Sequence, residues 1–521
     1  MKENNFFSKY YFLTLALSTY PVSLLFTSNI QNTRLIMFMI PLALVYFSAT
    51  CIYILFYIFR NKLSLKNYHL STSICTIVFF VYGIYRNWLL SCDTILRILG
   101  SHRLLFPITV LLLLGVVYVI NKVKVTSKTY KFVLVFLISF NVVPFLSLLN
   151  LSVFKAKEKT IITPILSNKL NNDGLPNIYY IILDGYGSDN SMKKVLNYDN
   201  SNFSKQLEDI GFKVQRNASS NYCRTVFSLS STLNLNYIQN IIKTNINQEN
   251  SNLLISNNLV SKVLKANGYI YYLFDSGFGV KNYNEENEVL IESNEFGFLH
   301  NLYTTSDNDV LNSFINNSII CVSKNSFFVD LSLKNYAEKV LNVFNKLPKI
   351  AKTPKKKFVF AHIISPHPPY LFDKYGNIGE YGNYDPNNTH GNFNWNSKLY
   401  VEQLKFINVK TLIALKEIIK NDKQDKIIII QGDHGTRTLP ETEKLSVNQK
   451  WVNEQYSILN AIFISKNDES KRFIYNNWDY SSVNTFRIIF NQYFESKLPL
   501  LKDNKYHAEL EEPYVFKKIN P

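Results

Sequence analysis

Long apolar stretches separated by short polar segments dominate the first 150 residues. Five such stretches lie at roughly 11–28, 36–59, 71–90, 104–120 and 132–151. A helix needs about 20 apolar residues to cross the ~30 Å hydrocarbon core of a bilayer. The pattern therefore predicts a transmembrane domain of about five helices in residues 1–151. The third stretch is the most polar, because Tyr82, Arg86 and Asn87 crowd its end.

After a polar linker at 152–175 the pattern changes to short β-rich runs that alternate with helical periodicity. Strands are expected in "NIYYIILD", "KKFVFAHIIS", "KIIIIQ" and "SILNAIFIS", and helices in "KNYAEKVLNVFNKL", "KLYVEQLKFINVKTLIALKEIIKN" and "SVNTFRIIFNQYF". The stretch "NLVSKVLKANGYIYYLFDS" predicts a helix followed by a strand. This alternation predicts an α/β domain at 176–521, with a mostly parallel sheet covered by helices. In such sheets ligands bind beyond the carboxyl ends of the strands.

The net charge of +17 raises the question of nucleic-acid binding. Residues 1–150 hold 13 Lys/Arg and only two acids, whereas residues 151–521 hold 43 Lys/Arg and 37 acids. The excess positive charge therefore flanks the apolar stretches. That distribution is typical of membrane orientation rather than of a nucleic-acid-binding face. We expect a lipid bilayer, and no nucleic acid, as a partner.

The basic residues also predict the orientation in the membrane. With five spans, the N-terminus and the second and fourth loops share one side, which carries nine basic residues: Lys2, Lys9, Arg60, Lys62, Lys66, Lys122, Lys124, Lys128 and Lys131. The opposite loops carry four: Arg34, Arg86, Arg97 and Arg103. The positive-inside rule then predicts a multi-pass protein of the plasma (inner) membrane with residues after about 152 outside the cytoplasm. This orientation requires an odd number of spans.

Three of the expected strands end in acids or histidines. Asp184 ends the first, His362 and His367 lie at the end of the second, and Asp433 and His434 end the third. If the strands are parallel, these groups meet at one edge and form an N/O-ligand site that suits Zn²⁺ or Mn²⁺. A lone strand-end Asp is more often the N-cap of the next helix. Three such ends together favour a shared site.

A stretch rich in hydroxyl groups lies between the first two of these strands. Residues 217–237, "NASSNYCRTVFSLSSTLNLNY", lead into an apolar segment compatible with a helix. A hydroxyl at a helix N-terminus gains from the free N–H groups there, and a metal would lower its pKa and activate it as a nucleophile. Ordinary helix capping by one of the many Ser and Thr residues is the alternative.

Taken as an ordered set, these motifs resemble the sulfatase-like branch of the alkaline phosphatase superfamily. "PNIYYIILDGYG" resembles its opening metal-binding strand, and "GDHG" resembles its later pair of metal ligands. "HIISPHPPY" resembles the HxxxxHxPY element of membrane-bound phosphoethanolamine transferases and lipoteichoic acid synthases. Those enzymes have about five N-terminal spans and an extracytoplasmic catalytic domain, so the resemblance extends over nearly the whole chain.

The resemblance implies a role for each motif residue. Thr225 and Ser228 match the T-x-x-S element whose threonine attacks, so Thr225 is the implied nucleophile. The implied metal ligands are Asp184, Thr225, Asp433 and His434, with zinc as the first choice and Mn²⁺, Mg²⁺ or Ca²⁺ as alternatives. His362 and His367 would contact the substrate phosphate, protonate the leaving group or hold a second metal.

Some residues depart from the family pattern. Many transferases have Glu at the position of Asp184. Cys223 lacks the sulfatase C/S-x-P/A-x-R context, so it is not expected to be a nucleophile. Nothing in the spacing of Cys223 and Cys321 decides whether they pair. No histidine lies between His434 and His507, and His507 is expected at the surface.

The expected function is a metal-dependent phosphotransferase. It would move a phospho-head group from a phospholipid or other phosphoester donor to a cell-envelope glycan through a threonine-bound intermediate. A membrane-anchored hydrolase, either a phosphodiesterase or a sulfoesterase, would share the same ligands and use water as the acceptor. A non-enzymatic envelope protein on the same scaffold is the third possibility.

Overall fold

The structure is a computed structural model. It describes residues 35–58, 65–92, 95–122, 174–242, 254–274, 287–291, 327–378, 396–438, 449–466, 468–476, 478–509 and 514–519, with a few single positions and short stretches elsewhere. The chain divides into two compact units, which are described separately below. One consists of residues 1–159 and 298–332, and the other of residues 160–297 and 333–521.

Among its described residues, the first unit contains three helices long and apolar enough to cross a membrane. They are α2 (Leu35–Ile58), α3 (Leu65–Ser91) and α5 (His102–Lys122), with the short α4 (Ile95–Leu99) before α5. They correspond to the second, third and fourth predicted spans. Leu111, Leu112 and Leu114 of α5 are each more than 60% exposed, as expected of a surface that faces lipid. The first and fifth predicted spans lie largely outside the described residues, as does most of the 152–175 linker, so the number of spans stays a prediction.

The second unit is built on a seven-stranded sheet. Its order is β2 (Lys213–Val214), β7 (Asn460–Ile464), β6 (Lys426–Gly432), β1 (Asn177–Leu183), β5 (Lys357–Ile363), β3 (Ile270–Phe274) and β4 (Glu288–Ile291). The five strands from β6 to β4 are parallel, which confirms the predicted mostly parallel sheet. The strand predicted in "SILNAIFIS" is β7, which runs antiparallel to β6 and β2.

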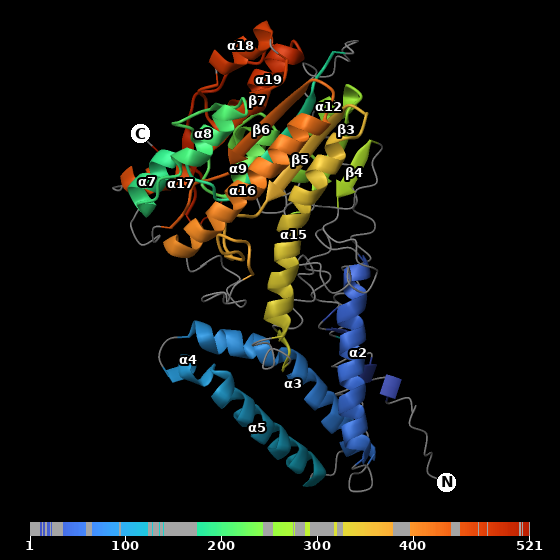
Figure 1. Cartoon of the computed structure of the whole chain (residues 1–521). Helices are drawn as coiled ribbons and strands as arrows, with labels where there is room; N and C mark the ends of the chain where they lie inside the picture. The colour runs from blue at the N-terminus through green and yellow to red at the C-terminus, as the bar shows by residue number, and fades with distance from the viewer. Residues whose placement is uncertain are drawn as a thin grey trace. The chain divides into compact units, whose positions relative to one another are not determined.

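Helices cover both faces of this sheet, as the sequence pattern predicted. One face packs against α9 (Thr225–Leu233), α12 (Leu259–Ala266), α18 (Glu469–Asn476) and α19 (Thr485–Tyr493), which share one apolar cluster with the strands. The long helix α16 (Ser397–Asn421) and the later part of α15 (Phe327–Ala351), which belongs to this unit, run along the strands in Figure 1. The other elements are short: α7 (Asp189–Leu196), α8 (Ser201–Asp209), α10 (Ile238–Ile241), α17 (Gln449–Tyr456), η4 (Ser482–Asn484), β8 (Lys505–His507) and β9 (Lys517–Ile519).

The four isoleucines of β6 show why the centre of the sheet is rigid. Ile427 to Ile430 are all fully buried, and Ile427 and Ile429 belong to the cluster with α9 and α19. A strand buried on both faces needs this continuous apolar run rather than an alternating pattern. The polar groups that follow the run are therefore carried on one of the most firmly packed elements of the unit.

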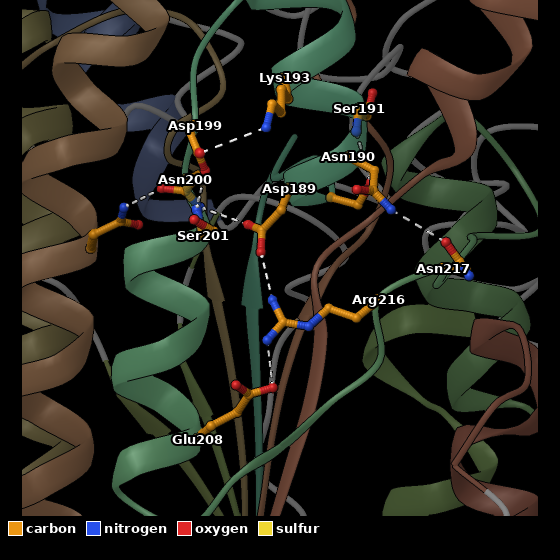
Figure 2. Close-up of polar contacts among 12 residues, drawn as sticks. Asp189, Asn190, Ser191, Lys193, Asp199, Asn200, Ser201, Glu208, Arg216 and Asn217 are labelled. Carbon is orange, nitrogen blue, oxygen red and sulfur yellow. Dashed lines mark hydrogen bonds and ion pairs between the residues drawn. The ribbon is translucent and has the colours of Figure 1, made fainter.

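A polar network ties the segment after β1 together. Figure 2 shows the guanidinium of Arg216 between Asp189 of α7 and Glu208 of α8, at 3.1 and 2.5 Å. Beside it, Asn200, Asn408 and the hydroxyl of Tyr186 form a buried ring, in which each side chain donates one hydrogen bond to the next. Tyr186 comes two residues after Asp184, so this ring fixes the turn that follows the first candidate ligand.

Candidate metal centre

The sheet register brings the predicted groups to one edge. Leu183, the last residue of β1, is paired with Ile363 of β5 on one side and with Gly432 of β6 on the other. The next residues, Asp184 and Asp433, therefore leave adjacent strands side by side. Gly185 has φ +70°, a conformation that glycine adopts without strain, and its N–H donates to Oδ1 of Asp433 at 2.9 Å. The ends of β1 and β6 are thus linked by a hydrogen bond.

All the predicted acids and histidines meet around the carboxylate of Asp184. Nε2 of His434 lies 3.3 Å from Oδ1 of Asp184, and Nε2 of His362 lies 3.1 Å from Oδ2. Two sets of three groups have their candidate ligand atoms within 4.8 Å of one another: Asp184, His367 and His434, and Asp184, His362 and Asp433. His367 is partly exposed, whereas the other four are at most 2% exposed. Side chains from three strand ends therefore form one compact N/O cluster.

Three buried atoms of this cluster make no hydrogen bond, although two of them, on Asp184 and His434, lie 3.3 Å apart. They are Oδ1 of Asp184, Oδ2 of Asp433 and Nε2 of His434. A buried polar atom without a partner costs about 1–3 kcal/mol. Nδ1 of His434 lies 2.8 Å from the carbonyl oxygen of Gly435, a contact that leaves Nε2 as the nitrogen free to bind a metal. Two carboxylate oxygens and one imidazole nitrogen left unpaired in this way fit a divalent metal such as zinc.

The pKa shifts of these groups differ in direction, because burial and the neighbouring charges compete at each of them. Burial alone would raise the pKa of Asp184, but His367, His362 and His434 outweigh it and hold that pKa well below its usual range. Burial lowers the pKa of His434, yet the carboxylates of Asp433 and Asp184 outweigh it and raise that pKa. Burial dominates at His367 and lowers its pKa despite the nearby Asp184. Asp184 is thus an ionised carboxylate at neutral pH, and His367 is a neutral imidazole.

Thr225 is brought to the same place by helix α9. It is the first residue of that helix, is 8% exposed, and its hydroxyl donates to Oδ2 of Asp184 at 3.5 Å. The structure thus places all six predicted residues, namely Asp184, Thr225, His362, His367, Asp433 and His434, around one carboxylate. His362 has a second contact, because its Nδ1 lies 3.1 Å from the hydroxyl of Ser276.

Helix α16 holds two of the loops that carry these groups. The hydroxyl of Tyr400 donates to the carbonyl oxygen of Gly185 at 2.9 Å. Oε1 of Gln403 accepts from the backbone N–H of Leu371 at 2.5 Å, and its Nε2 donates to the carbonyl oxygen of His367 at 3.2 Å. Both side chains are fully buried. The sequence did not identify them, because a Tyr and a Gln within a helical pattern carry no local signal of a contact with a distant loop.

The C-terminal segment holds the residues that precede Thr225. Tyr506 of β8 donates its backbone N–H to the carbonyl oxygen of Asn221 at 2.9 Å, and Arg224 donates to the carbonyl oxygen of Ala508 at 3.2 Å. Sγ of Cys223, a free cysteine, lies 3.5 Å from Nδ1 of His507. His507, which was expected at the surface, is partly exposed and also contacts this segment. Cys321 lies outside the described residues.

Neither the family models nor the curated proteins give a match to this chain. Solved structures do. The C-terminal periplasmic domain of EcEptC from Escherichia coli, in complex with zinc, is 12% identical over 67% of this chain and 94% of its own, with a TM-score of 0.41. The integral membrane lipooligosaccharide phosphoethanolamine transferase A from Neisseria meningitidis is 13% identical over 92% of this chain and 95% of its own, with a TM-score of 0.38.

A third solved structure is a protein of the alkaline phosphatase superfamily from Vibrio parahaemolyticus. It is 12% identical over 68% of this chain and 82% of its own, with a TM-score of 0.36. The similar structures thus include the superfamily and the phosphoethanolamine transferases that the sequence motifs resemble. At these identities and TM-scores, the function of this chain is inferred from its own residues.

Proposed function

We propose that this protein is a membrane-anchored, metal-dependent phosphotransferase. It moves a phospho-head group from a lipid donor to a hydroxyl of an envelope glycan. The observation that carries the proposal is the set of three unpartnered buried atoms, on Asp184, Asp433 and His434, next to the hydroxyl of Thr225. A site that combines a metal-binding set with an adjacent hydroxyl suits phosphoryl transfer through a covalent intermediate.

Each residue then has a defined task. Asp184, Asp433 and His434, with the hydroxyl of Thr225, would hold zinc, which supplies Lewis acidity toward a phosphoryl oxygen and lowers the pKa of a hydroxyl. Asp184 already accepts the hydrogen bond of Thr225, so the hydroxyl is oriented for the loss of its proton. His362, behind Asp184 and bonded to its Oδ2, orients that carboxylate.

The reaction has two balanced steps. Oxygen Oγ1 of Thr225 attacks the phosphorus of the donor, the ester bond from phosphorus to the lipid oxygen breaks, and the lipid leaves with a proton. A glycan hydroxyl then attacks the phosphothreonine, the bond from phosphorus to Oγ1 breaks, and Oγ1 takes up a proton as the glycan hydroxyl loses its own. His367, which is neutral and partly exposed, would accept the proton of the glycan hydroxyl and supply the one that Oγ1 takes up.

The membrane helices support a lipid donor and a location at the inner membrane. Three apolar helices precede the α/β unit. The basic residues of the first 150 positions favour a cytoplasmic N-terminus and an extracytoplasmic α/β unit. An anchored enzyme of this kind meets its lipid donor in the same bilayer, and it meets glycan acceptors outside the cytoplasm.

Mass analysis of the intact purified protein after incubation with phospholipid tests this proposal. We expect a phospho-head-group adduct on Thr225, no adduct on Thr225→Ala, and loss of the adduct when a glycan hydroxyl is added. An adduct that persists on Thr225→Ala would contradict the assignment of the nucleophile. Release of the head group into water, with no glycan product, would instead make the protein a hydrolase.

A further inference from the structure

A buried carboxylate lies under the loop that carries Asp433 and His434. Glu454, near the end of α17, is fully buried. Its Oε1 accepts three hydrogen bonds from this loop. The hydroxyl of Thr436 donates at 2.9 Å, and the backbone N–H and hydroxyl of Thr438 donate at 2.5 and 2.6 Å. A single buried oxygen that accepts three hydrogen bonds from one loop is a strong local anchor for that loop.

The backbone of the same loop packs against the backbone of α17. The N–H of Gly435 donates to the carbonyl oxygen of Gln455 at 2.9 Å, and a Cβ on Gly435 would overlap the carbonyl oxygen of Glu454. Arg437, between the two threonines, has φ +53°, a conformation that a side chain other than glycine rarely adopts. The end of α17 therefore holds the loop from Gly435 to Thr438 on both sides of Arg437.

We propose that Glu454 is a positioning residue for the candidate metal centre. Its carboxylate fixes the turn after His434 and, through that turn, the orientation of Asp433 and His434 toward Asp184. The link to His434 is direct, because Nδ1 of His434 lies 2.8 Å from the carbonyl oxygen of Gly435, the residue packed on Glu454. Residues that orient metal ligands in this way typically change metal affinity by about 10–100-fold when they are removed. The inference rests on the proposed function, which supplies the metal.

Asp422 provides a matched control, because it is also a buried carboxylate in which one oxygen has three partners. Its Oδ2 accepts from the hydroxyl of Tyr179 at 2.6 Å and from Nδ2 of Asn177 at 2.8 Å, and lies 3.6 Å from Nζ of Lys357. These partners include the first residues of β1 and β5, Asn177 and Lys357, at the opposite end of the strands from the metal centre. Loss of the Asp422 carboxylate should therefore destabilise the fold without changing the positions of the metal ligands.

The experiment measures the zinc dissociation constant and thermal stability of the full-length protein in detergent. We expect Glu454→Ala to weaken zinc binding by about 10-fold or more. We expect Glu454→Gln, which keeps an acceptor oxygen, to recover most of the affinity, and Thr438→Val to show an intermediate loss. Asp422→Asn should lower the unfolding temperature and leave zinc affinity within about 3-fold of wild type, a change well below the range expected for an orienting residue.

The outcomes separate this inference from the proposed function. Zinc affinity unchanged in both Glu454→Ala and Thr438→Val overturns the positioning role, provided Asp433→Asn still abolishes binding. A Glu454→Gln variant as impaired as the alanine variant also overturns it, because the hydrogen bonds would then not be the cause. If the wild-type chain binds no zinc, the proposed function itself fails.

Discussion

Gly185 donates its backbone N–H to the side chain of Asp433, although 248 positions separate the two residues. The turn after one candidate ligand is therefore held by the side chain of another. This bond uses Oδ1 of Asp433, so Oδ2 is the oxygen left for a metal. The two carboxylate oxygens of Asp433 thus have different tasks, one structural and one chemical.

Asp433→Asn separates these two tasks. The amide keeps an oxygen that can accept from Gly185, but replaces Oδ2 with a nitrogen donor that cannot bind a cation. We expect the fold to persist, bound zinc to fall to background, and the zinc-dependent rise in unfolding temperature to disappear. Metal analysis and thermal unfolding with and without zinc measure this. Asp373→Asn, at a partly exposed carboxylate in the loop after β5, is the control, and normal zinc content in Asp433→Asn would refute the metal assignment.

Gly435→Ala tests the contact between the ligand loop and α17. The added Cβ would overlap the carbonyl oxygen of Glu454, so the loop must move. We expect a loss of about 1–3 kcal/mol in unfolding free energy, together with weaker zinc binding. Gly268→Ala is the control. It has φ +82° but open space around its Cβ, so it should lose about 1–2 kcal/mol through backbone strain alone and bind zinc normally. Equal zinc affinities in the two variants would contradict this account.

Tyr186→Phe tests the buried ring beside the first ligand. The hydroxyl of Tyr186 donates to Asn408 and accepts from Asn200, so its removal leaves two buried amide groups each short of one partner. We expect a loss of about 1–3 kcal/mol in unfolding free energy. Denaturant titration of the purified protein measures it. Tyr375→Phe, at a side chain that is 75% exposed, should change the value by less than about 0.5 kcal/mol. Comparable losses in both variants would show that the ring adds nothing.

His507 predicts a specific pH dependence of stability. Burial, followed by the nearby Arg224, lowers its pKa from 6.5 to about 4; Glu509 opposes this shift, and Arg437 and Lys517 add to it. Between pH 6.5 and 4 the unfolded chain binds a proton that the folded chain excludes, so this group makes stability fall as the pH falls through that window. Above pH 6.5 and below pH 4, His507 adds nothing to the pH dependence of stability.

The test is the unfolding temperature of wild type and His507→Gln from pH 7.5 to 4. The variant should lose less stability than wild type as the pH is lowered from 6.5 to 4. The difference between the two unfolding temperatures at pH 7.5 gives the effect of the altered packing alone. Parallel curves would mean that His507 titrates normally in the folded protein.

Much of the α/β unit could be predicted because its strands are short apolar runs with polar residues placed just beyond them. Asp184 and Asp433 were recognisable as strand ends, and only parallel strands could bring both to one edge. The direction of β7 could not be predicted in this way, since an apolar run reads the same for parallel and antiparallel pairing. Its antiparallel course is set by its neighbours β6 and β2.

The residues that hold the site in place were beyond the reach of sequence patterns. Glu454, Tyr400 and Gln403 lie within helices, where their residue types are unremarkable. Their roles arise from contacts with loops that are 16 to 215 positions away. Metal ligands are recognised by their chemistry, but a residue that orients them is recognised only when its partner is known.

The pairing of β8 with the segment before Thr225 has a consequence for the timing of assembly. Asn221 and Arg224 are held by Tyr506 and Ala508, close to 300 positions further along the chain. A ribosome makes the chain from its N-terminus, so the stretch with Thr225 leaves the ribosome long before the segment that pins it. The candidate nucleophile is therefore set in place only near the end of synthesis, and a nascent chain still lacking residues 505–508 should carry the metal ligands without an ordered Thr225.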